Sequence, residues 1–106
     1  MLNSRPSILV LGSTGSVGTQ ALDVALRLNF PVDGICAHHN VDAAEQQARA
    51  FGVRVCAMAD ESAANELKIK LADTSTKVVG GMSGILDMIR ESDAEIAVHS
   101  MMGQAG

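Results

Sequence analysis

The sequence predicts an α/β fold in which a doubly wound parallel sheet carries helices on both faces, a three-layer α/β/α arrangement. Three observations predict it. Short apolar or β-branched runs alternate with longer segments whose apolar residues recur at helical spacing. Two of the runs, Ile-Leu-Val-Leu at 8–11 and Ile-Ala-Val at 96–98, are continuously apolar, which is typical of parallel strands buried on both faces. Glycines at turn-forming spacing join the first run to the first helical segment.

Five runs are expected to form strands, and their character indicates an order in the sheet. The fourth run is short and begins with the charged Lys77, so we expect it at an edge, beyond the third strand. The fifth is expected to return beside the first, which places its carboxyl end at the switch point where open α/β sheets bind ligands. We expect the first and fifth to be the central strands. The five runs are residues 7–11, 32–37, 53–58, 77–80 and 95–101.

The first helix is expected to end near Asn29, just before Pro31. Its polar face carries Asp23, which directly follows the glycine-rich segment. Because Arg27 lies four residues further on, we expect a surface ion pair rather than a catalytic acid. Five residues are expected to form the apolar stripe that packs on the sheet: Val17, Ala21, Val24, Ala25 and Leu28.

The other three helices have start signals of different kinds. Asp42 and Glu45 have capping-box spacing at the start of the second helix, and Gly52 is placed to end it. Asp60 is expected to open the third helix, and the fourth is expected to start near Ser83. The expected apolar faces are Ala64, Leu67 and Leu71 in the third helix and Met82, Ile85, Leu86 and Ile89 in the fourth.

Composition narrows the class of protein. The 106 residues are 47% hydrophobic and 2% aromatic, with a formal net charge of -4. These values predict one small domain over residues 1–106, too short for a complete two-domain enzyme, and they exclude a nucleic-acid binder. No apolar run reaches the roughly 18 residues that span a bilayer, and no signal peptide precedes the fold, so we expect a cytoplasmic location with Cys36 and Cys56 reduced. Because the chain stops in a loop after the fifth strand, we expect it to be the amino-terminal part of a longer protein.

The segment Gly12-Ser13-Thr14-Gly15-Ser16-Val17-Gly18 carries the sharpest local signal. Glycines after a buried strand let the backbone turn tightly and approach a pyrophosphate, and free amides at a helix start favour anionic oxygens. Thr14 and Ser16 can add hydroxyl donors. The spacing is GxxGxxG, and no lysine follows as a nucleotide-hydrolysing loop requires, so the pattern predicts dinucleotide binding on a Rossmann-like sheet. The alternative is that these glycines only shape a turn.

The type of dinucleotide is decided at the end of the second strand, where NAD enzymes place an acid on the ribose. That position holds Ala37-His38-His39-Asn40, with no acid. Since capping accounts for Asp42, nothing at this edge repels the 2′-phosphate, and we expect NADP(H). The adjacent histidines are expected to be exposed turn residues, and we assign no metal site to them.

The residues 11–18, followed by Ala-Leu-Asp-Val at 21–24, resemble the opening of the 1-deoxy-D-xylulose 5-phosphate reductoisomerases, which are NADPH enzymes of non-mevalonate isoprenoid biosynthesis. Residues 37–40 are similar to the short cofactor segment of that family, and Gly-Gln-Ala-Gly at 103–106 resembles its G-x-A-G. The likeness covers essentially the whole chain, although residues 53–92 match only in layout.

The resemblance implies a set of cofactor contacts. Thr14, Gly15, Ser16 and Val17 would line the pyrophosphate of NADPH, and His38, His39 and Asn40 would face the adenosine ribose and its phosphate. The catalytic loop, the sugar-phosphate ligands and the ligands of the divalent cation, Mg or Mn, would all follow residue 106, so no catalytic or metal residue is assigned here. The full-length enzyme would be a homodimer, and this segment alone would be inactive.

One pair of residues departs from the family pattern, which usually has glycine followed by lysine or arginine where His38 and His39 stand. Titratable groups thus replace a fixed cation, and we expect NADPH affinity to rise as the pH falls through about 6.5, the ordinary range for histidine. Two alternatives stay open. One is an NADP-dependent dehydrogenase of the aspartate-semialdehyde or homoserine type, and the other is a non-catalytic NADP(H) sensor.

Overall fold

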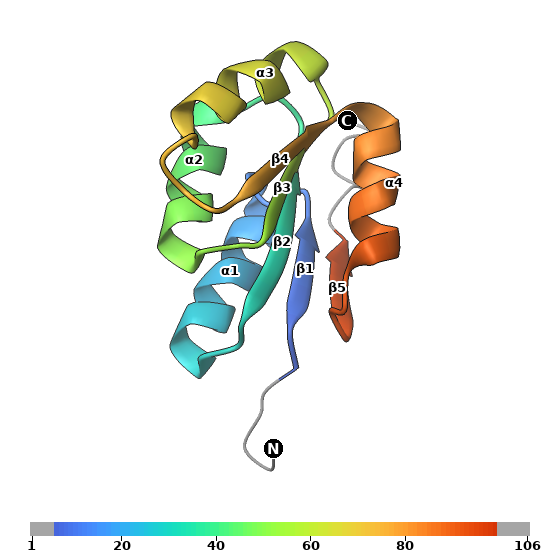
Figure 1. The fold of residues 1–106 in the computed structure, drawn as a ribbon. Coiled ribbons are helices and arrows are strands. Elements are labelled where there is room, and N and C mark those ends of the chain that lie inside the picture. Colours follow the sequence, from blue (N-terminus) through green and yellow to red (C-terminus); the bar gives the residue numbers. More distant parts are fainter. Residues whose placement is uncertain (1–5, 100–106) are drawn as a thin grey trace.

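The structure is a computed structural model that describes residues 6–99, in which strands and helices alternate strictly (Figure 1). None of its helices is both long and apolar enough to cross a bilayer. The elements in chain order are β1 (Ile8–Leu11), α1 (Ser16–Leu28), β2 (Val32–Ala37), α2 (Val41–Phe51), β3 (Val55–Met58), α3 (Glu61–Lys70), β4 (Lys77–Gly80), α4 (Gly81–Glu91) and β5 (Ile96–His99).

All pairings in the sheet are parallel, and the strand order is β4-β3-β2-β1-β5. This order confirms both sequence placements, β4 beyond β3 and β5 beside β1. The expectation that β5 is a central strand is wrong for the described residues, because β5 pairs with β1 and forms the other edge. Ile96 is accordingly 42% exposed, whereas Val10 in β1 is fully buried. A continuous apolar run therefore indicated a parallel strand but not its position in the sheet.

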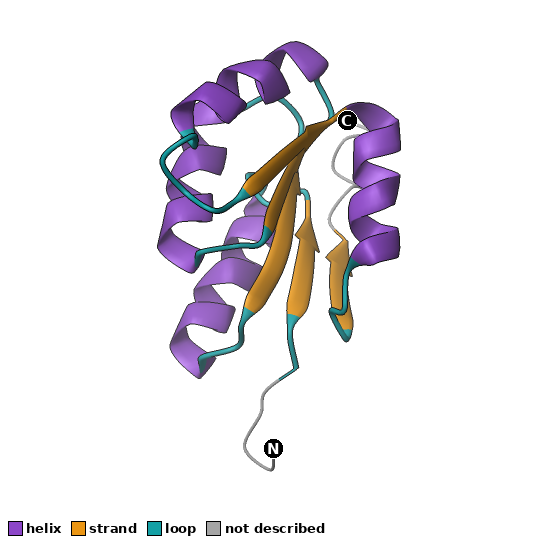
Figure 2. Cartoon of the chain, viewed as in Figure 1, coloured by secondary structure: helices purple, strands orange, loops and turns teal. Residues whose placement is uncertain are grey.

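Helices cover both faces of the sheet, as Figure 2 shows, so the three-layer fold class is confirmed. Helices α1, α2 and α3 share one core with one face of the strands, and the fully buried Ile35, Cys56 and Leu67 lie in it. Helix α4 packs on the opposite face, where Met88 joins Leu9 in a smaller core. Cys36 and Cys56 lie in different cores, and both are free thiols.

Helix α1 turns to the sheet a face that overlaps the expected stripe only in part, because Ala25 is buried and Ala21 half-buried but the other three stripe residues are exposed. The residues that it buries are Gly18, Leu22 and Ala25. Val17, Val24 and Leu28, expected in the stripe, are exposed to 55%, 45% and 50%. Apolar residues occur on two sides of this helix, and the sheet takes the side with the smallest residues, which lets the backbone come close. The expected end at Asn29 is confirmed, since this residue takes the left-handed conformation (φ 60°).

Helix α4 shows the same error, because it buries Gly81, Gly84 and Met88. Met82, Leu86 and Ile89 are exposed, and Ile85 is only half-buried. The helix also starts at Gly81, two residues before the expected Ser83. In α3 the expected face is confirmed, with Ala64, Leu67 and Leu71 all buried.

The cap of α2 differs from the expected capping box. Asn40 is the N-cap, and its Oδ1 accepts a hydrogen bond from the backbone N–H of Ala43 (3.1 Å). Asp42 lies in the first helical turn, and Glu45 pairs with Arg49 (3.1 Å). Asparagine caps a helix as well as aspartate does, and the cap lies two residues before the expected one, with Asn40 in that role. The expected stop at Gly52 (φ 58°) and the Asp60 cap of α3 are confirmed.

Candidate functional site

The glycine loop connects β1 to α1 and is tied to the end of β2. The N–H groups of Gly12 and Ser13 both donate to the carbonyl oxygen of Cys36, at 2.7 and 2.9 Å. Gly12 has φ 89°, a conformation that favours glycine, and its carbonyl oxygen accepts from the N–H of Gly15 (3.2 Å). The hydroxyl of Thr19 donates to the carbonyl oxygen of Gly15 (2.7 Å). The loop is therefore a bonded turn rather than a loose connection.

Gly18 and Gly15 have different reasons to be glycine. A Cβ on Gly18 would lie 2.1 Å from the carbonyl oxygen of Gly12, so the loop rests directly on the first turn of α1. A Cβ on Gly15 would lie 3.6 Å from the same oxygen, an ordinary contact. Gly18 is thus required for the loop to pack on α1. Gly15 is not required for packing, but without a side chain it leaves the exposed side of the loop open to a ligand. This geometry fits a phosphate group, which needs close backbone approach.

The start of α1 presents uncapped amides to solvent. Gly15 is the N-cap and supplies no side-chain hydrogen bond, whereas Asn40 caps α2 through its side chain. Gly15, Ser16 and Val17 are exposed and Thr14 is half-exposed, so the structure brings these four residues together at the carboxyl edge of the sheet. Free N–H groups and the positive end of the helix dipole favour an anion at this position.

The second predicted segment, His38, His39 and Asn40, follows β2 at the same edge. Because β1 and β2 are adjacent and parallel, and the loop N–H groups bond to the end of β2, this segment lies beside the glycine loop. All three residues are exposed. The Nδ1 atoms of the two histidines are 3.0 Å apart, so one of them donates and the other accepts. The side-chain oxygen of Asn40 is engaged as the α2 cap.

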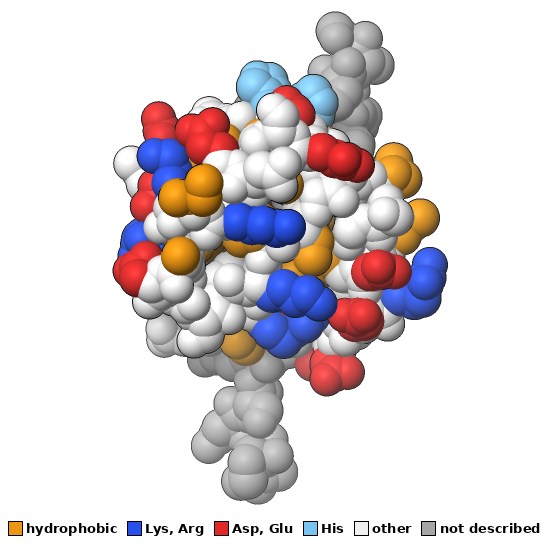
Figure 3. Space-filling view, turned by 45° about the horizontal axis from the view of Figure 1, so that its top comes forward, with side chains coloured by type: hydrophobic (Ala, Val, Ile, Leu, Met, Phe, Trp, Pro, Cys, Tyr) orange, Lys and Arg blue, Asp and Glu red, His pale blue; other side chains and the backbone are white. Residues whose placement is uncertain are grey.

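Positive charge is separated from this edge. In the part of the chain that the structure describes, every Lys and Arg lies in the last turn of a helix or at the start of a strand. Both places are at the amino ends of the strands, at the edge of the sheet opposite the glycine loop. The histidine side chains gather at one end of the molecule, beside acidic side chains (Figure 3). The described basic side chains near the loop are therefore histidines. The residues at the opposite edge are Arg27, Arg49, Arg54, Lys68, Lys70, Lys77 and Arg90.

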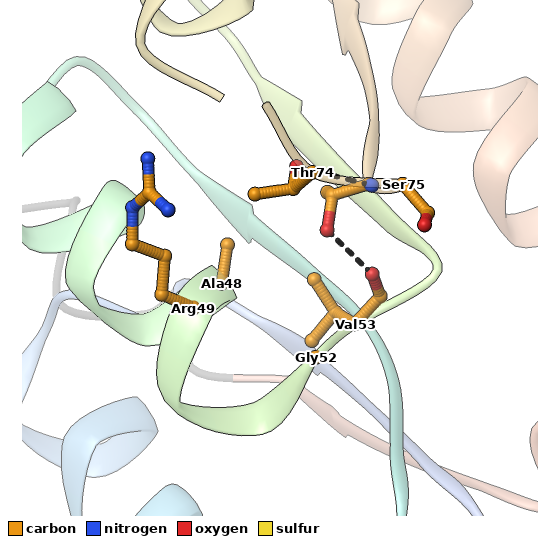
Figure 4. A pocket seen from close by; sticks show the side chains of 7 residues that line it. Ala48, Arg49, Gly52, Val53, Thr74 and Ser75 are labelled. Atoms are coloured by element: carbon orange, nitrogen blue, oxygen red, sulfur yellow. Dashed lines mark hydrogen bonds between the residues drawn. The ribbon is translucent and has the colours of Figure 1, made fainter. Parts of the chain in front are cut away.

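A hollow of about 230 Å³ lies at that opposite edge, between the end of α2 and the segment before β4 (Figure 4). Arg49 lines it but is paired with Glu45 (3.1 Å) and Asp73 (2.8 Å). The hydroxyl of Thr76, also in its wall, donates to the carbonyl oxygen of Val53 (2.8 Å). Because these groups already have partners, the hollow lacks a free cation for an anionic ligand.

The thiols and carboxylates of the described residues do not gather into a cluster of reactive groups. No three His, Cys, Asp or Glu side chains gather into a possible metal site among residues 6–99. Burial raises the pKa of the Cys36 thiol to about 11 and that of Cys56 to about 12, so both stay protonated at neutral pH. Asp23 pairs with Arg27 (2.9 Å) on an exposed face, as predicted. The Gly-Gln-Ala-Gly segment at 103–106 lies outside the described residues.

Two residues that shape the loop, Gln47 and Thr19, were not predicted from the sequence. Ser13 is fully buried, and its carbonyl oxygen accepts a hydrogen bond from Nε2 of Gln47 in α2 (2.9 Å). The hydroxyl of Thr19, in the first turn of α1, also bonds to the loop. Spacing carried no signal for Gln47, because 34 residues separate it from Ser13.

Comparison with known proteins agrees with this geometry. A family model described as 1-deoxy-D-xylulose 5-phosphate reductoisomerase matches residues 8–106. The chain belongs to this family. The reductoisomerase of Acetivibrio thermocellus is 51% identical over 78 residues, which are 74% of this chain and 20% of that protein. That of Halothermothrix orenii is 36% identical over 104 residues, 96% of this chain and 27% of that protein. The chain thus spans about a quarter of the length of these curated reductoisomerases.

Solved reductoisomerase structures share the fold. The enzyme from Zymomonas mobilis in complex with NADPH superposes with a TM-score of 0.82 at 27% identity, covering 89% of this chain and 25% of that one. A structure described as DOX-P reductoisomerase in complex with NADPH, fosmidomycin and magnesium has a TM-score of 0.80 at 19% identity, which supports the fold alone. The Rossmann-like class predicted from the alternating pattern is confirmed.

Proposed function

We propose that this chain is the NADPH-binding segment of an enzyme that isomerises and reduces 1-deoxy-D-xylulose 5-phosphate to 2-C-methyl-D-erythritol 4-phosphate. The observation that carries the proposal is the uncapped start of α1 beneath a glycine loop whose backbone is fixed by bonds to Cys36 and Thr19. Family membership and the NADPH named for the Zymomonas mobilis enzyme support the same ligand. When bound, NADPH supplies a hydride to the substrate.

The roles of the individual residues follow from their places at the carboxyl edge. Thr14, Gly15, Ser16 and Val17 surround the pyrophosphate, with backbone N–H groups and two hydroxyls as donors. His38, His39 and Asn40 face the adenosine ribose and its phosphate. Because the Asn40 oxygen is occupied by the helix cap, its side-chain N–H₂ is the group that it offers to the ribose.

The remaining functions belong to the intact enzyme. We propose that the ligands of the divalent cation, Mg or Mn, the sugar-phosphate contacts and the catalytic groups lie outside this chain, so that residues 1–106 alone turn over no substrate. We further propose that the intact enzyme works as a homodimer in the bacterial cytoplasm. Supplying the 106-residue chain with NADPH, substrate and Mg²⁺ should therefore give no NADPH oxidation, and measurable turnover would contradict this assignment.

Calorimetric titration with NADPH, with NADH alongside, tests the cofactor assignment on both the intact enzyme and the 106-residue chain. Gly15→Asp adds a carboxylate at the N-cap of α1, where the pyrophosphate is proposed to lie, and we expect the variant to fold because a Cβ there makes only an ordinary contact. We expect NADPH to bind more tightly than NADH, and the variant to lose at least about tenfold in affinity through charge repulsion. Absence of NADPH binding in the folded intact enzyme would show that the glycines only shape a turn.

A further inference from the structure

The hydrogen bond from Gln47 to the glycine loop reaches across the fold. Nε2 of Gln47, in α2, donates to the carbonyl oxygen of Ser13 at 2.9 Å. The other bonds that fix the loop come from β2, through Cys36, and from α1, through Thr19, whose hydroxyl donates to the Gly15 carbonyl oxygen (2.7 Å) and lies 3.4 Å from that of Ser13. We propose that Gln47 is a positioning residue for NADPH, which orients the loop without touching the cofactor. This inference rests on the proposed function.

The geometry of the peptide bond explains how the effect is transmitted. In a planar trans peptide, the carbonyl of Ser13 and the N–H of Thr14 point in opposite directions. Gln47 holds the Ser13 carbonyl toward α2, so the Thr14 N–H points away from α2, toward the mouth of the loop. This N–H has no hydrogen-bond partner within residues 6–99. Gln47 thereby aims a free donor at the place where the pyrophosphate is proposed to lie.

The surroundings of Gln47 indicate that stability alone does not account for an amide there. Its Oε1 is buried without a hydrogen-bond partner among the described residues, as is the hydroxyl of Ser13. A buried unpaired acceptor costs free energy. Gln47 also lines a groove between α1 and α2 whose walls include Leu22, Leu26 and Phe51. An apolar side chain of the same length would fit this groove without the unpaired oxygen, so the amide is explained by its donor.

Gln47→Met in the intact enzyme tests the proposal, because methionine keeps the length of the side chain and removes the donor. Gln46→Met is the matched control, since Gln46 is the exposed neighbour in the same groove and helix. We expect Gln47→Met to raise both the NADPH dissociation constant and the KM for NADPH about three- to tenfold, the loss of one hydrogen bond. The kcat at saturating NADPH and the unfolding midpoint should stay at or above wild-type values.

Hydrogen exchange supplies a readout that needs no turnover. Peptides covering residues 11–16 should exchange faster in Gln47→Met than in wild type or Gln46→Met, because the loop loses its bond to α2. Where Gln47→Met fails to fold, Gln47→Glu, which has the same shape and an acceptor in place of the donor, is read in the same assays. An NADPH dissociation constant within twofold of wild type in the donor-free variant overturns the role of Gln47. Wild-type enzyme that binds no NADPH overturns the proposed function itself.

Discussion

At the scale of single residues, the loop geometry depends on the absence of a side chain at one glycine as much as on its hydrogen bonds. Gly18 has no space for a Cβ beside the Gly12 carbonyl, whereas Gly15 has. The sequence predicted both as loop glycines from the GxxGxxG spacing, because close helix approach and tight turning are local properties. It could not rank them, since the distance to Gly12 depends on how the folded turn closes.

Gly18→Ala should therefore disrupt the loop, while Gly15→Ala should not. The alanine methyl at position 18 forces the loop away from α1, and we expect the free energy of unfolding to fall by about 1 to 3 kcal/mol. NADPH binding should weaken in parallel. Urea unfolding followed by circular dichroism measures the first effect. Gly15→Ala, with its Cβ in ordinary contact, is the control and should remain within about 1 kcal/mol of wild type. Equal losses in the two variants would contradict the close contact at Gly18.

At the scale of elements, helical periodicity correctly identified all four helices but misjudged the buried face of α1 and α4. In α1 the sheet contacts Leu22, while Leu28 is half exposed. A pattern with apolar residues on two sides satisfies either orientation. Only the distance between helix and sheet, set by small residues such as Gly18 and Ala25, selects one of them.

Leu22→Ala and Leu28→Ala form a matched test of this orientation. Leu22 is 3% exposed, so its truncation leaves a cavity and should cost about 2 to 5 kcal/mol in the free energy of unfolding. Leu28→Ala removes a half-exposed side chain and should cost less than about 1 kcal/mol. Chemical denaturation of both variants decides between the two faces. A larger loss in Leu28→Ala would restore the stripe expected from periodicity.

Asp33 joins three elements at the edge of the sheet opposite the loop. It lies in β2, accepts two hydrogen bonds from Arg54 before β3 (both 3.1 Å) and one from the hydroxyl of Ser92 after α4 (2.6 Å). The hydrogen bonds from Arg54 hold the pKa of this carboxyl below its ordinary value, against the opposing effect of burial. The stabilisation is therefore complete above the ordinary pKa, near 4, and is lost as the pH falls through the lowered one.

Asp33→Asn should consequently destabilise the fold by about 1 to 2 kcal/mol at pH 7. The difference from wild type should shrink as the pH drops below about 4, because the Asp33 carboxyl then takes up a proton first in the unfolded chain and, at lower pH, in the folded one. Thermal unfolding of both proteins between pH 2.5 and 7 measures it. Asp23→Asn, which breaks the exposed pair with Arg27, should have little effect at any pH. A difference for Asp33→Asn that grows on acidification would have the wrong sign for a lowered pKa.

At the scale of the whole molecule, charge is divided between the two edges of the sheet. The described lysines and arginines lie at helix carboxyl ends, where they complement the helix dipoles, or at strand starts, and the edge where NADPH is proposed to bind carries His38 and His39. The carboxylates of Asp42 and Asp60 begin the neighbouring helices α2 and α3, and His99 ends β5 on the other side of β1. Among the described residues, His38 and His39 are thus the basic side chains that the 2′-phosphate of NADPH would meet at this edge under the proposed function.

NADPH affinity should rise relative to NADH affinity as the pH falls from 8.5 to 5.5, because protonated histidines add positive charge beside the extra phosphate. Calorimetric titration of the intact enzyme with both cofactors across this range measures the difference. In His38→Gln/His39→Gln the preference should become independent of pH. A pH-independent preference in the wild type would refute the dependence on the histidines.

The sequence alone determined the element order, the placement of β4 beyond β3 and of β5 beside β1, the glycine loop before α1 and the helix ends at Asn29 and Gly52. Each of these features follows from local backbone preferences or from a short-range sequence pattern, and both act independently of the rest of the fold. Only the tertiary structure decided which faces of α1 and α4 are buried, that β5 lies at an edge of the described sheet, and that Gln47 bonds to Ser13. These features depend on distances between segments far apart in the chain, which no local pattern encodes.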